Sequence, residues 1–298
     1  MKQLLILLII ALTFNAQAQS TTKLAALKQQ IEQIIQSKKA DIGVAILGIE
    51  DKDSLTINKN TYYPMQSVYK LHLALAVLHE VDKGKLALNQ PVLITKRDLL
   101  PNTWSPMRDK YPEGNVSLPL SEILGYSVSK SDNNACDILF RLIGGTKKVH
   151  KYIRKLGIKN VSIVATEEEM SKEWSIQFTN KTRPFSAVQL LEKFYNTPIL
   201  SKETQGFLWK TLVETTTGPH KIKGLLPVGT VVGHKTGASG INKEGITGAS
   251  NDIGIVSLPN GKHFAIAVFV ANSKENNETN EKTIAEITKA TWDYYLNK

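Results

Sequence analysis

The order of its hydrophobic patterns most constrains the fold of this 298-residue chain. Apolar residues at helical spacing from Leu24 to Ile35 predict a first helix that ends near Lys38, and two strand-like runs follow over Ile42–Ile49 and Ser54–Asn58. Far downstream come three more strands and a closing amphipathic helix, which we expect over Val231–Ala238, Asp252–Leu258, Phe264–Ala271 and Asn280–Leu296. This order predicts an α+β fold, with a five-stranded antiparallel sheet built from both chain ends and flanked by helices.

The middle of the chain carries helical patterns only. They cover Leu71–Val81, Leu120–Tyr126, Asn134–Ile143, Val149–Leu156, Ala187–Tyr195 and Thr204–Val213. We therefore expect a sheet domain from residues 19–64 and 215–298, and an inserted helical domain from residues 65–214. The junction of two such parts is a common place for an active-site cleft.

The N-terminus has the pattern of an export signal. Lys2 precedes the apolar run Leu4–Leu12, and Ala16-Gln17-Ala18 follows, which predicts a signal peptide over residues 1–18 and a periplasmic protein. The apolar run is too short to span a bilayer comfortably, so we expect no stable membrane anchor. Cys136 is the single cysteine, so no intramolecular disulfide is possible. We expect a monomer.

The charge balance limits the class of partner. The formal net charge is +10, but the lysines are scattered and no nucleic-acid-binding motif is present, so we expect no nucleic-acid partner. A basic balance suits anionic small substrates, and it equally suits a protein that its charge keeps soluble. The six histidines form no His-x-His cluster, and we expect neither a metal nor another cofactor.

Three short motifs carry the chemistry. Ser67-Val68-Tyr69-Lys70 opens a helix, which puts a nucleophile and a potential base on one face, one turn apart. Taken alone, this pattern is more simply a serine near a helix start, and a second Ser-x-x-Lys occurs at Ser127. The other two motifs are Ser131-Asp132-Asn133 before a helix and Lys235-Thr236-Gly237 in a strand. Each is common in isolation, but the occurrence of all three motifs in this order is much less likely by chance.

The three motifs together resemble those of the class A serine β-lactamases. The resemblance covers the whole mature chain. It is closest to the PER and VEB branch, in the segments 64–67 (Pro-Met-Gln-Ser), 214–218 (Glu-Thr-Thr-Thr-Gly) and 223–227 (Lys-Gly-Leu-Leu-Pro). It implies the α/β sandwich of these enzymes, β-lactam substrates and antibiotic resistance.

The resemblance also implies four catalytic residues and an oxyanion hole. Ser67 would be the nucleophile, Lys70 the adjacent base or proton relay, and Ser131 the donor of a proton to the lactam nitrogen. The backbone N–H groups of Ser67 and Ala238 would form the oxyanion hole. The deacylating glutamate lies in the run Glu167-Glu168-Glu169, where composition cannot choose among three; alignment to the family pattern selects Glu167.

Other residues would bind substrate. The resemblance assigns Asn133 to the acylamide side chain and the pair Lys235 and Thr236 to the carboxylate, with Ala238, Ser239 and Lys221 beside them. Trp104 resembles an aromatic at the cleft mouth, and a buried core tryptophan is the alternative. Lys221 stands where the family often has arginine, and a lysine cannot hold a carboxylate in the two-pronged way of arginine.

The glutamate loop departs from the common class A pattern. Ala165 stands where the family usually has an arginine, and Asn180 stands where it has the aspartate partner of that arginine. The loop therefore lacks the usual ion pair. This loop and the glycine-rich segment 240–248 suggest a roomy cleft and activity on oxyimino-cephalosporins. The alternatives are a D-alanyl-D-alanine peptidase, which would acylate without fast deacylation, and a non-catalytic β-lactam sensor. Metal-dependent lactam hydrolysis has little support.

Overall fold

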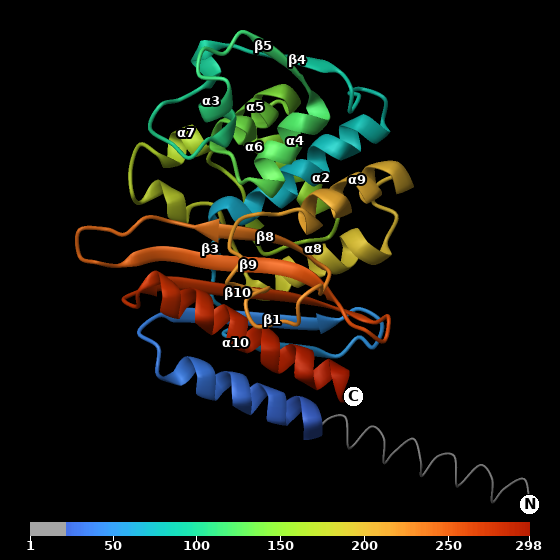
Figure 1. Cartoon of the computed structure of the whole chain (residues 1–298), viewed down its shortest axis with the longest axis vertical. Helices are drawn as coiled ribbons and strands as arrows, with labels where there is room; N and C mark the ends of the chain where they lie inside the picture. Colours follow the sequence, from blue (N-terminus) through green and yellow to red (C-terminus); the bar gives the residue numbers. More distant parts are fainter. Residues whose placement is uncertain (1–21) are drawn as a thin grey trace, which may run out of the picture.

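The computed structural model describes residues 22–298 of the chain, so the predicted signal peptide lies outside the described residues. A five-stranded antiparallel sheet in the order β2-β1-β10-β9-β8 organises the fold (Figure 1). Its strands are β1 (Asp41–Gly48), β2 (Ser54–Ile57), β8 (Val232–Ala238), β9 (Thr247–Ser257) and β10 (His263–Ser273). The predicted α+β fold and its five-stranded sheet from both chain ends are confirmed.

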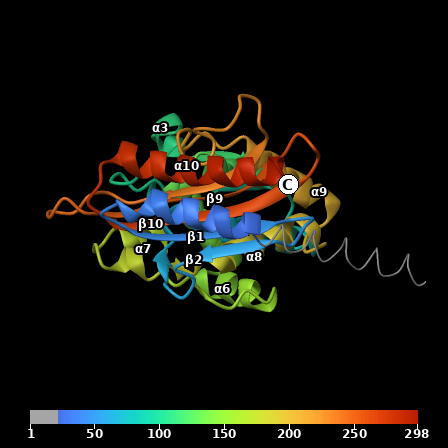
Figure 2. The same ribbon diagram turned by 90° about the horizontal axis from the view of Figure 1, so that it is seen from below.

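Helices from the two chain ends cover one face of the sheet. Residues 22–36 are helical, and α10 (Asn277–Leu296) runs next to them in both views (Figures 1 and 2). Leu27 and Ile31 from the first helix and Ile284 and Ile287 from α10 share one hydrophobic cluster with apolar residues of the sheet. Alternation along the strands sends the other side chains into a second, larger cluster with the helical segment.

The helical segment lies mainly beyond the β8 edge of the sheet (Figure 1). Its helices are α2 (Tyr69–Asp82), α3 (Pro106–Lys110), α4 (Leu120–Ser129), α5 (Asn133–Ile143), α6 (Thr146–Lys155), α7 (Glu167–Met170), α8 (Pro184–Asn196) and α9 (Lys202–Val213). Short 3-10 turns add η1 (Gln66–Val68), η2 (Lys96–Asp98) and η3 (Ile176–Phe178). α8 packs against β1, since a Cβ on Gly43 would meet the Pro184 ring at 2.8 Å.

The sequence patterns did not predict the short strands of this segment. β3 (Tyr63–Pro64) and β6 (Val161–Ser162) both pair with β7 (Lys181–Thr182), and β4 (Pro91–Ile94) pairs with β5 (Val116–Pro119). Strands of two to four residues are too short for a readable alternation. They matter for the site, because β3 leads directly into the turn that carries Ser67.

Candidate active site

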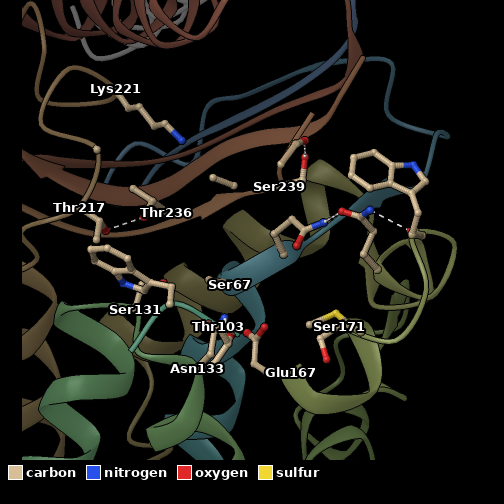
Figure 3. Close-up of a pocket in the computed structure, with 18 of the residues that line it drawn as sticks. Ser67, Thr103, Ser131, Asn133, Glu167, Ser171, Thr217, Lys221, Thr236 and Ser239 are labelled. Carbon is tan, nitrogen blue, oxygen red and sulfur yellow. Dashed lines mark hydrogen bonds between the residues drawn. The ribbon is translucent and has the colours of Figure 1, made fainter. Parts of the chain in front are cut away.

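A cavity of about 560 Å³ opens between β8 and the helical segment. Most of the predicted site residues line it, namely Ser67, Trp104, Ser131, Asn133, Glu167, Lys221, Thr236, Ala238 and Ser239. Figure 3 shows Ser67 between the β8 side, with Thr236 and Ser239, and the opposite wall, with Asn133 and Glu167. Lys70 and Lys235 are fully buried beside the cavity. The fold thus brings the predicted residues together.

The nucleophile turn is held close to the sheet. Ser67 lies in η1, directly before α2, and the preceding Gln66 has a left-handed φ of 48°. On β8, a Cβ at Gly237 would approach the Met65 carbonyl oxygen to 2.4 Å, so only glycine allows this contact. The close approach places Ala238, the next residue, at the cavity wall opposite the turn. The Ser67 hydroxyl makes no hydrogen bond within residues 22–298.

Three oxygens surround the Lys70 ammonium group. Nζ donates to the Ser131 carbonyl at 2.8 Å and to Asn133 Oδ1 at 2.5 Å, and it lies 3.0 Å from Glu167 Oε1. The Glu167 side chain is only 11% exposed, so this ion pair is largely shielded from water. A lysine ammonium has three N–H donors, and each has an oxygen within reach. The contact joins α2, the Ser-Asp-Asn loop and the glutamate loop at one point.

Ser131 is positioned by its neighbours on both sides. It has a left-handed φ of 58°, and the following Asp132 caps α5 by accepting the Ala135 N–H at 2.8 Å. Asp132 also accepts the Met107 N–H at 2.7 Å, so this buried carboxylate fixes the loop through side-chain to backbone hydrogen bonds. Lys235 Nζ then donates to Ser131 Oγ at 2.9 Å. Burial, and next the Lys70 charge, lower the pKa of Lys235 well below its usual range.

The structure distinguishes the three successive glutamates. Glu167 is the one that contacts Lys70. Glu169 points back to form a capping box, with its Oε2 accepting the Thr166 N–H at 2.8 Å and Thr166 Oγ1 accepting the Glu169 N–H. Glu168 is exposed. Within this single helical turn, the Glu167 carboxylate therefore faces the cavity, while Glu168 and Glu169 do not line it.

Asn180 holds the glutamate loop closed by hydrogen bonds, in place of the ion pair that the loop lacks. Its fully buried side chain accepts the N–H groups of Val164 and Ala165 at 2.8 and 3.0 Å, and it donates to the Ala165 carbonyl at 2.7 Å. A neutral amide can satisfy donors and an acceptor together, which a carboxylate cannot. The loop is thus closed through backbone hydrogen bonds, and no arginine is needed.

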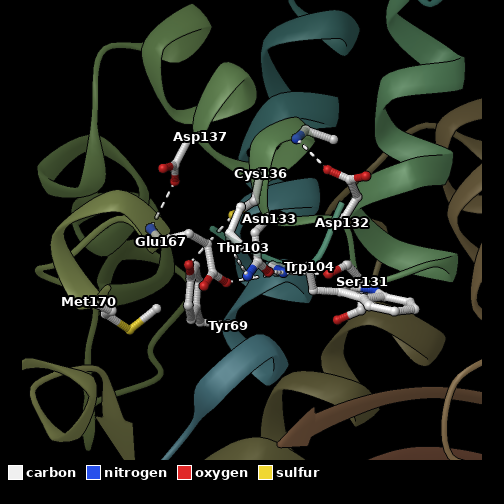
Figure 4. A network of polar contacts seen from close by, with 12 residues as sticks. Tyr69, Thr103, Trp104, Ser131, Asp132, Asn133, Cys136, Asp137, Glu167 and Met170 are labelled. Carbon is white, nitrogen blue, oxygen red and sulfur yellow. Dashed lines mark hydrogen bonds and ion pairs between the residues drawn. The ribbon is translucent and has the colours of Figure 1, made fainter. Parts of the chain in front are cut away.

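Asp137 of α5 holds the other end of the loop. Its two carboxylate oxygens accept the N–H groups of Glu167 and Glu168, both at 2.8 Å (Figure 4). Burial raises the pKa of Asp137 to about 6, although both N–H donors favour the ionised form. The pair of bonds fixes the backbone of Glu167 relative to Asn133, four residues earlier on the same helix face.

Replacing Asn180 by alanine is expected to destabilise the protein by about 2–4 kcal/mol, because three buried backbone groups lose their partner. Urea unfolding followed by circular dichroism measures this loss. We also expect deacylation to slow more than acylation, because the loop carries Glu167. Thr179→Ala is the matched control, since the adjacent hydroxyl is exposed and bonds only within its own turn. A loss of equal size in both variants would contradict the bracing role of Asn180.

The substrate-binding candidates differ in exposure. Trp104 is 60% exposed at the cavity, with its Nε1 donating to the Lys130 carbonyl at 2.9 Å, so the alternative of a buried core tryptophan is wrong. Asn133 Nδ2 donates to Thr103 Oγ1 at 2.6 Å. Lys221 is only 3% exposed, and burial lowers its pKa. These contacts set the orientation of each side chain before any substrate binds.

Several residues of the site carry no sequence motif. Thr217 Oγ1 lies 2.6 Å from Thr236 Oγ1, and Gln66 Nε2 donates to Gln177 Oε1 at 2.6 Å, which ties the nucleophile turn to the glutamate loop. Asp137 had a readable signal, because its i,i+4 spacing from Asn133 places it on the same face of α5. The Gln66–Gln177 pair had none, since 111 residues separate the two.

Neither residue of the second Ser-x-x-Lys pattern, Ser127 and Lys130, lines the cavity. Ser127 is fully buried in α4 and its hydroxyl has no partner among residues 22–298, while Lys130 lies over the Tyr126 ring. Within the same described range, no three His, Cys, Asp or Glu side chains are grouped so that they could hold a metal ion. None of the helices described there is long and apolar enough to cross a membrane.

Comparison with known proteins places this geometry in a family. The model of the β-lactamase enzyme family matches residues 26–295. β-Lactamase VEB-1 of Pseudomonas aeruginosa is 48% identical over 98% of both chains. Extended-spectrum β-lactamase PER-1 of the same organism is also 48% identical, over 96% of this chain and 91% of its own length.

Solved structures agree with the sequence relatives. The crystal structure of the TLA-1 extended-spectrum β-lactamase is 60% identical and superposes with a TM-score of 0.90, covering 91% of this chain and 99% of that one. A class A β-lactamase from Bacteroides cellulosilyticus is 39% identical with the same TM-score, covering 93% and 99%. The chain therefore belongs to the β-lactamase enzyme family, as a serine β-lactamase of class A.

Proposed function

We propose that this enzyme opens the β-lactam ring through an acyl-enzyme on Ser67 and hydrolyses that ester with water activated by Glu167. The contact that carries this proposal is the 3.0 Å approach of Lys70 Nζ to Glu167 Oε1, beside the Ser131 loop. It supports a single proton-transfer centre next to the nucleophile. A nucleophilic serine needs such a centre, because its hydroxyl is a weak nucleophile until a base takes the proton.

Acylation forms the Ser67 Oγ–carbonyl carbon bond and breaks the lactam C–N bond. The proton that leaves Oγ goes to the proton-transfer centre, and Ser131 Oγ delivers a proton to the lactam nitrogen. Lys235, which donates to Ser131 Oγ at 2.9 Å, would stabilise the charge that develops there. Because three oxygens already surround the Lys70 ammonium, the contacts favour Glu167 over Lys70 as the group that first takes up the Ser67 proton.

Deacylation reverses these roles. Glu167 takes a proton from water, the resulting hydroxide attacks the ester carbon, and the Ser67 oxygen leaves with a proton. The N–H groups of Ser67 and Ala238 are proposed to bind the oxyanion in both half-reactions, and losing one such donor typically costs about 3–4 kcal/mol of barrier lowering. A fast second step separates this reaction from that of a D-alanyl-D-alanine peptidase.

Substrate recognition is proposed to depend on two cationic residues and an amide. Lys235 with Thr236, and Lys221 beside them, would bind the carboxylate, while Asn133 would bind the acylamide group. Trp104 and Ser239 stand at the cavity wall for the remaining parts of the substrate. We further propose a periplasmic monomer with no membrane anchor, a sheet domain of residues 19–64 and 215–298, and a helical domain of residues 65–214.

The substrate range is proposed to include oxyimino-cephalosporins as well as penicillins. The roomy cavity of about 560 Å³ and the extended-spectrum enzymes among the relatives support this range. We expect the purified protein to hydrolyse nitrocefin, benzylpenicillin and cefotaxime, with rates unchanged by a chelator. Steady-state kinetics on the three substrates measure this. Turnover of penicillins without measurable cefotaxime hydrolysis would contradict the extended range, and loss of all activity with the chelator would contradict the serine mechanism.

A further inference from the structure

A fully buried carboxylate lies behind the proposed carboxylate-binding residues. Asp252 of β9 is 2.9 Å from His234 Nδ1 through Oδ2, and the same oxygen accepts the Ile222 N–H at 3.2 Å. An ionised carboxylate has no proton to give, so His234 Nδ1 is the donor. Asp252 therefore bonds the residue that precedes Lys235 and the residue that follows Lys221.

The two lysines need a nearby negative charge. Both are buried, and burial lowers the pKa of each, while the Asp252 charge acts in the opposite direction on both. Lys221 Nζ donates to the Asn251 carbonyl at 3.3 Å, and within residues 22–298 it forms no salt bridge. An isolated ammonium is costly to bury, and besides Asp252 only Glu281 raises the pKa of Lys221.

The geometry of these contacts sets the positions of the two cations. Thr236, which pairs with Asp252 across β8 and β9, lies at the cavity between Lys221 and Ser131 (Figure 3). A shift of the Asp252 side chain would disturb the backbone N–H of Ile222 and the imidazole of His234 together. Both lysines follow, because each is the direct neighbour of one of these residues.

We propose that Asp252, with His234, is a positioning residue for substrate-carboxylate recognition: it holds Lys221 and Lys235 in place through Ile222 and His234. This inference rests on the proposed binding roles of Lys221 and Lys235. Asp252 touches no substrate, so it acts only through its neighbours. The consequence is a defect that is larger for substrates that carry the carboxylate than for those that lack it, since Lys235 also donates to Ser131 whichever substrate is bound.

The test compares nitrocefin with its carboxylate methyl ester in Asp252→Asn. This variant keeps the shape of the side chain but removes its charge. We expect kcat/KM for nitrocefin to fall about ten-fold or more, mainly through KM, and kcat/KM for the ester to fall by a clearly smaller factor, because only the contact of Lys235 with Ser131 is affected there. Ser250→Ala is the matched control, since it removes a buried hydroxyl without a partner, among the described residues, from the same strand. In this control, the ratio of kcat/KM for nitrocefin to kcat/KM for the ester should equal that of the wild type.

The outcomes separate this inference from the proposed function. If the wild type shows no preference for the acid over the ester, the proposed binding roles of the lysines fail and the inference falls with them. If the wild type prefers the acid and Asp252→Asn keeps that preference, or loses both substrates equally, the positioning role alone is overturned. If Asp252→Asn does not fold, His234→Phe is tested instead. This variant removes the Nδ1 donor, and we expect it to lower the preference for nitrocefin over its ester. An unchanged preference in that folded variant overturns the inference.

Discussion

Replacing Ser67 by alanine is expected to lower kcat/KM for nitrocefin by about 10⁵–10⁶-fold, as loss of the nucleophile does in other serine hydrolases. This corresponds to a barrier higher by about 7–8 kcal/mol. The melting temperature should stay within about one degree, because the Ser67 hydroxyl makes no hydrogen bond within the described chain. Mass spectrometry after incubation with a penicillin should show no covalent adduct. Steady-state kinetics and thermal unfolding complete the measurement.

Ser127→Ala is a matched control for this experiment. Ser127 has the same Ser-x-x-Lys spacing, but its side chain is buried in α4 with no partner among residues 22–298. The control variant should form the adduct and hydrolyse nitrocefin at the wild-type rate. An adduct on Ser67→Ala, or the loss of the adduct in Ser127→Ala alone, would show that the nucleophile has been assigned to the wrong motif.

Glu167→Gln is expected to trap the acyl-enzyme. Without the carboxylate no base takes the proton from the attacking water, and loss of a positioned general base typically costs about 10²–10⁴-fold. Rapid mixing with a penicillin should give a burst in which about one equivalent of β-lactam ring is opened per enzyme, followed by slow turnover. Mass spectrometry should then show a long-lived adduct. The rate of the burst measures acylation separately. A burst slower than acylation of the wild type would support Glu167 as the base of acylation as well.

Glu168→Gln is the control for the glutamate assignment. Glu168 is the next residue in the same acidic turn, but it is exposed, whereas the Glu167 carboxylate is 3.0 Å from Lys70 Nζ. We expect wild-type turnover and no adduct in the control. Normal turnover in Glu167→Gln, together with an accumulating adduct in Glu168→Gln, would move the role to the neighbouring carboxylate. A stable adduct in the wild-type protein would indicate a peptidase-like enzyme.

The elements of the fold were largely predictable, because their patterns are local. Helical spacing over Leu71–Val81 and strand patterns at both chain ends correspond to α2 and to the strands of the sheet. The boundaries were less predictable. β9 begins at Thr247, five residues before the predicted start at Asp252. Its first residues pair with the C-terminal end of β10, as Thr247 does with Ser273. Such pairing depends on a strand distant in sequence.

The chemistry of the site was partly predictable from local spacing. Ser67 and Lys70 share a face one turn apart, and Ser131 precedes a helix whose cap is Asp132, so short stretches of chain bring each pair together. The sequence could not show that Trp104 is exposed or that Lys221 is buried, since both properties depend on what packs around them. It also could not show how a loop without its ion pair is held.

The sequence by itself determined the order of elements, the family and the motif residues, since these follow from short-range spacing and composition. Composition left three successive glutamates open and the family pattern selected Glu167, but only the tertiary structure supplied the physical reason, which is contact with Lys70 from a helix far away in the chain. Only the tertiary structure showed Asn180 closing the glutamate loop and Asp252 joining β8 to the turn that carries Lys221. The physical reason is the same in each case: a buried polar group needs a partner, and packing decides which distant residue supplies it.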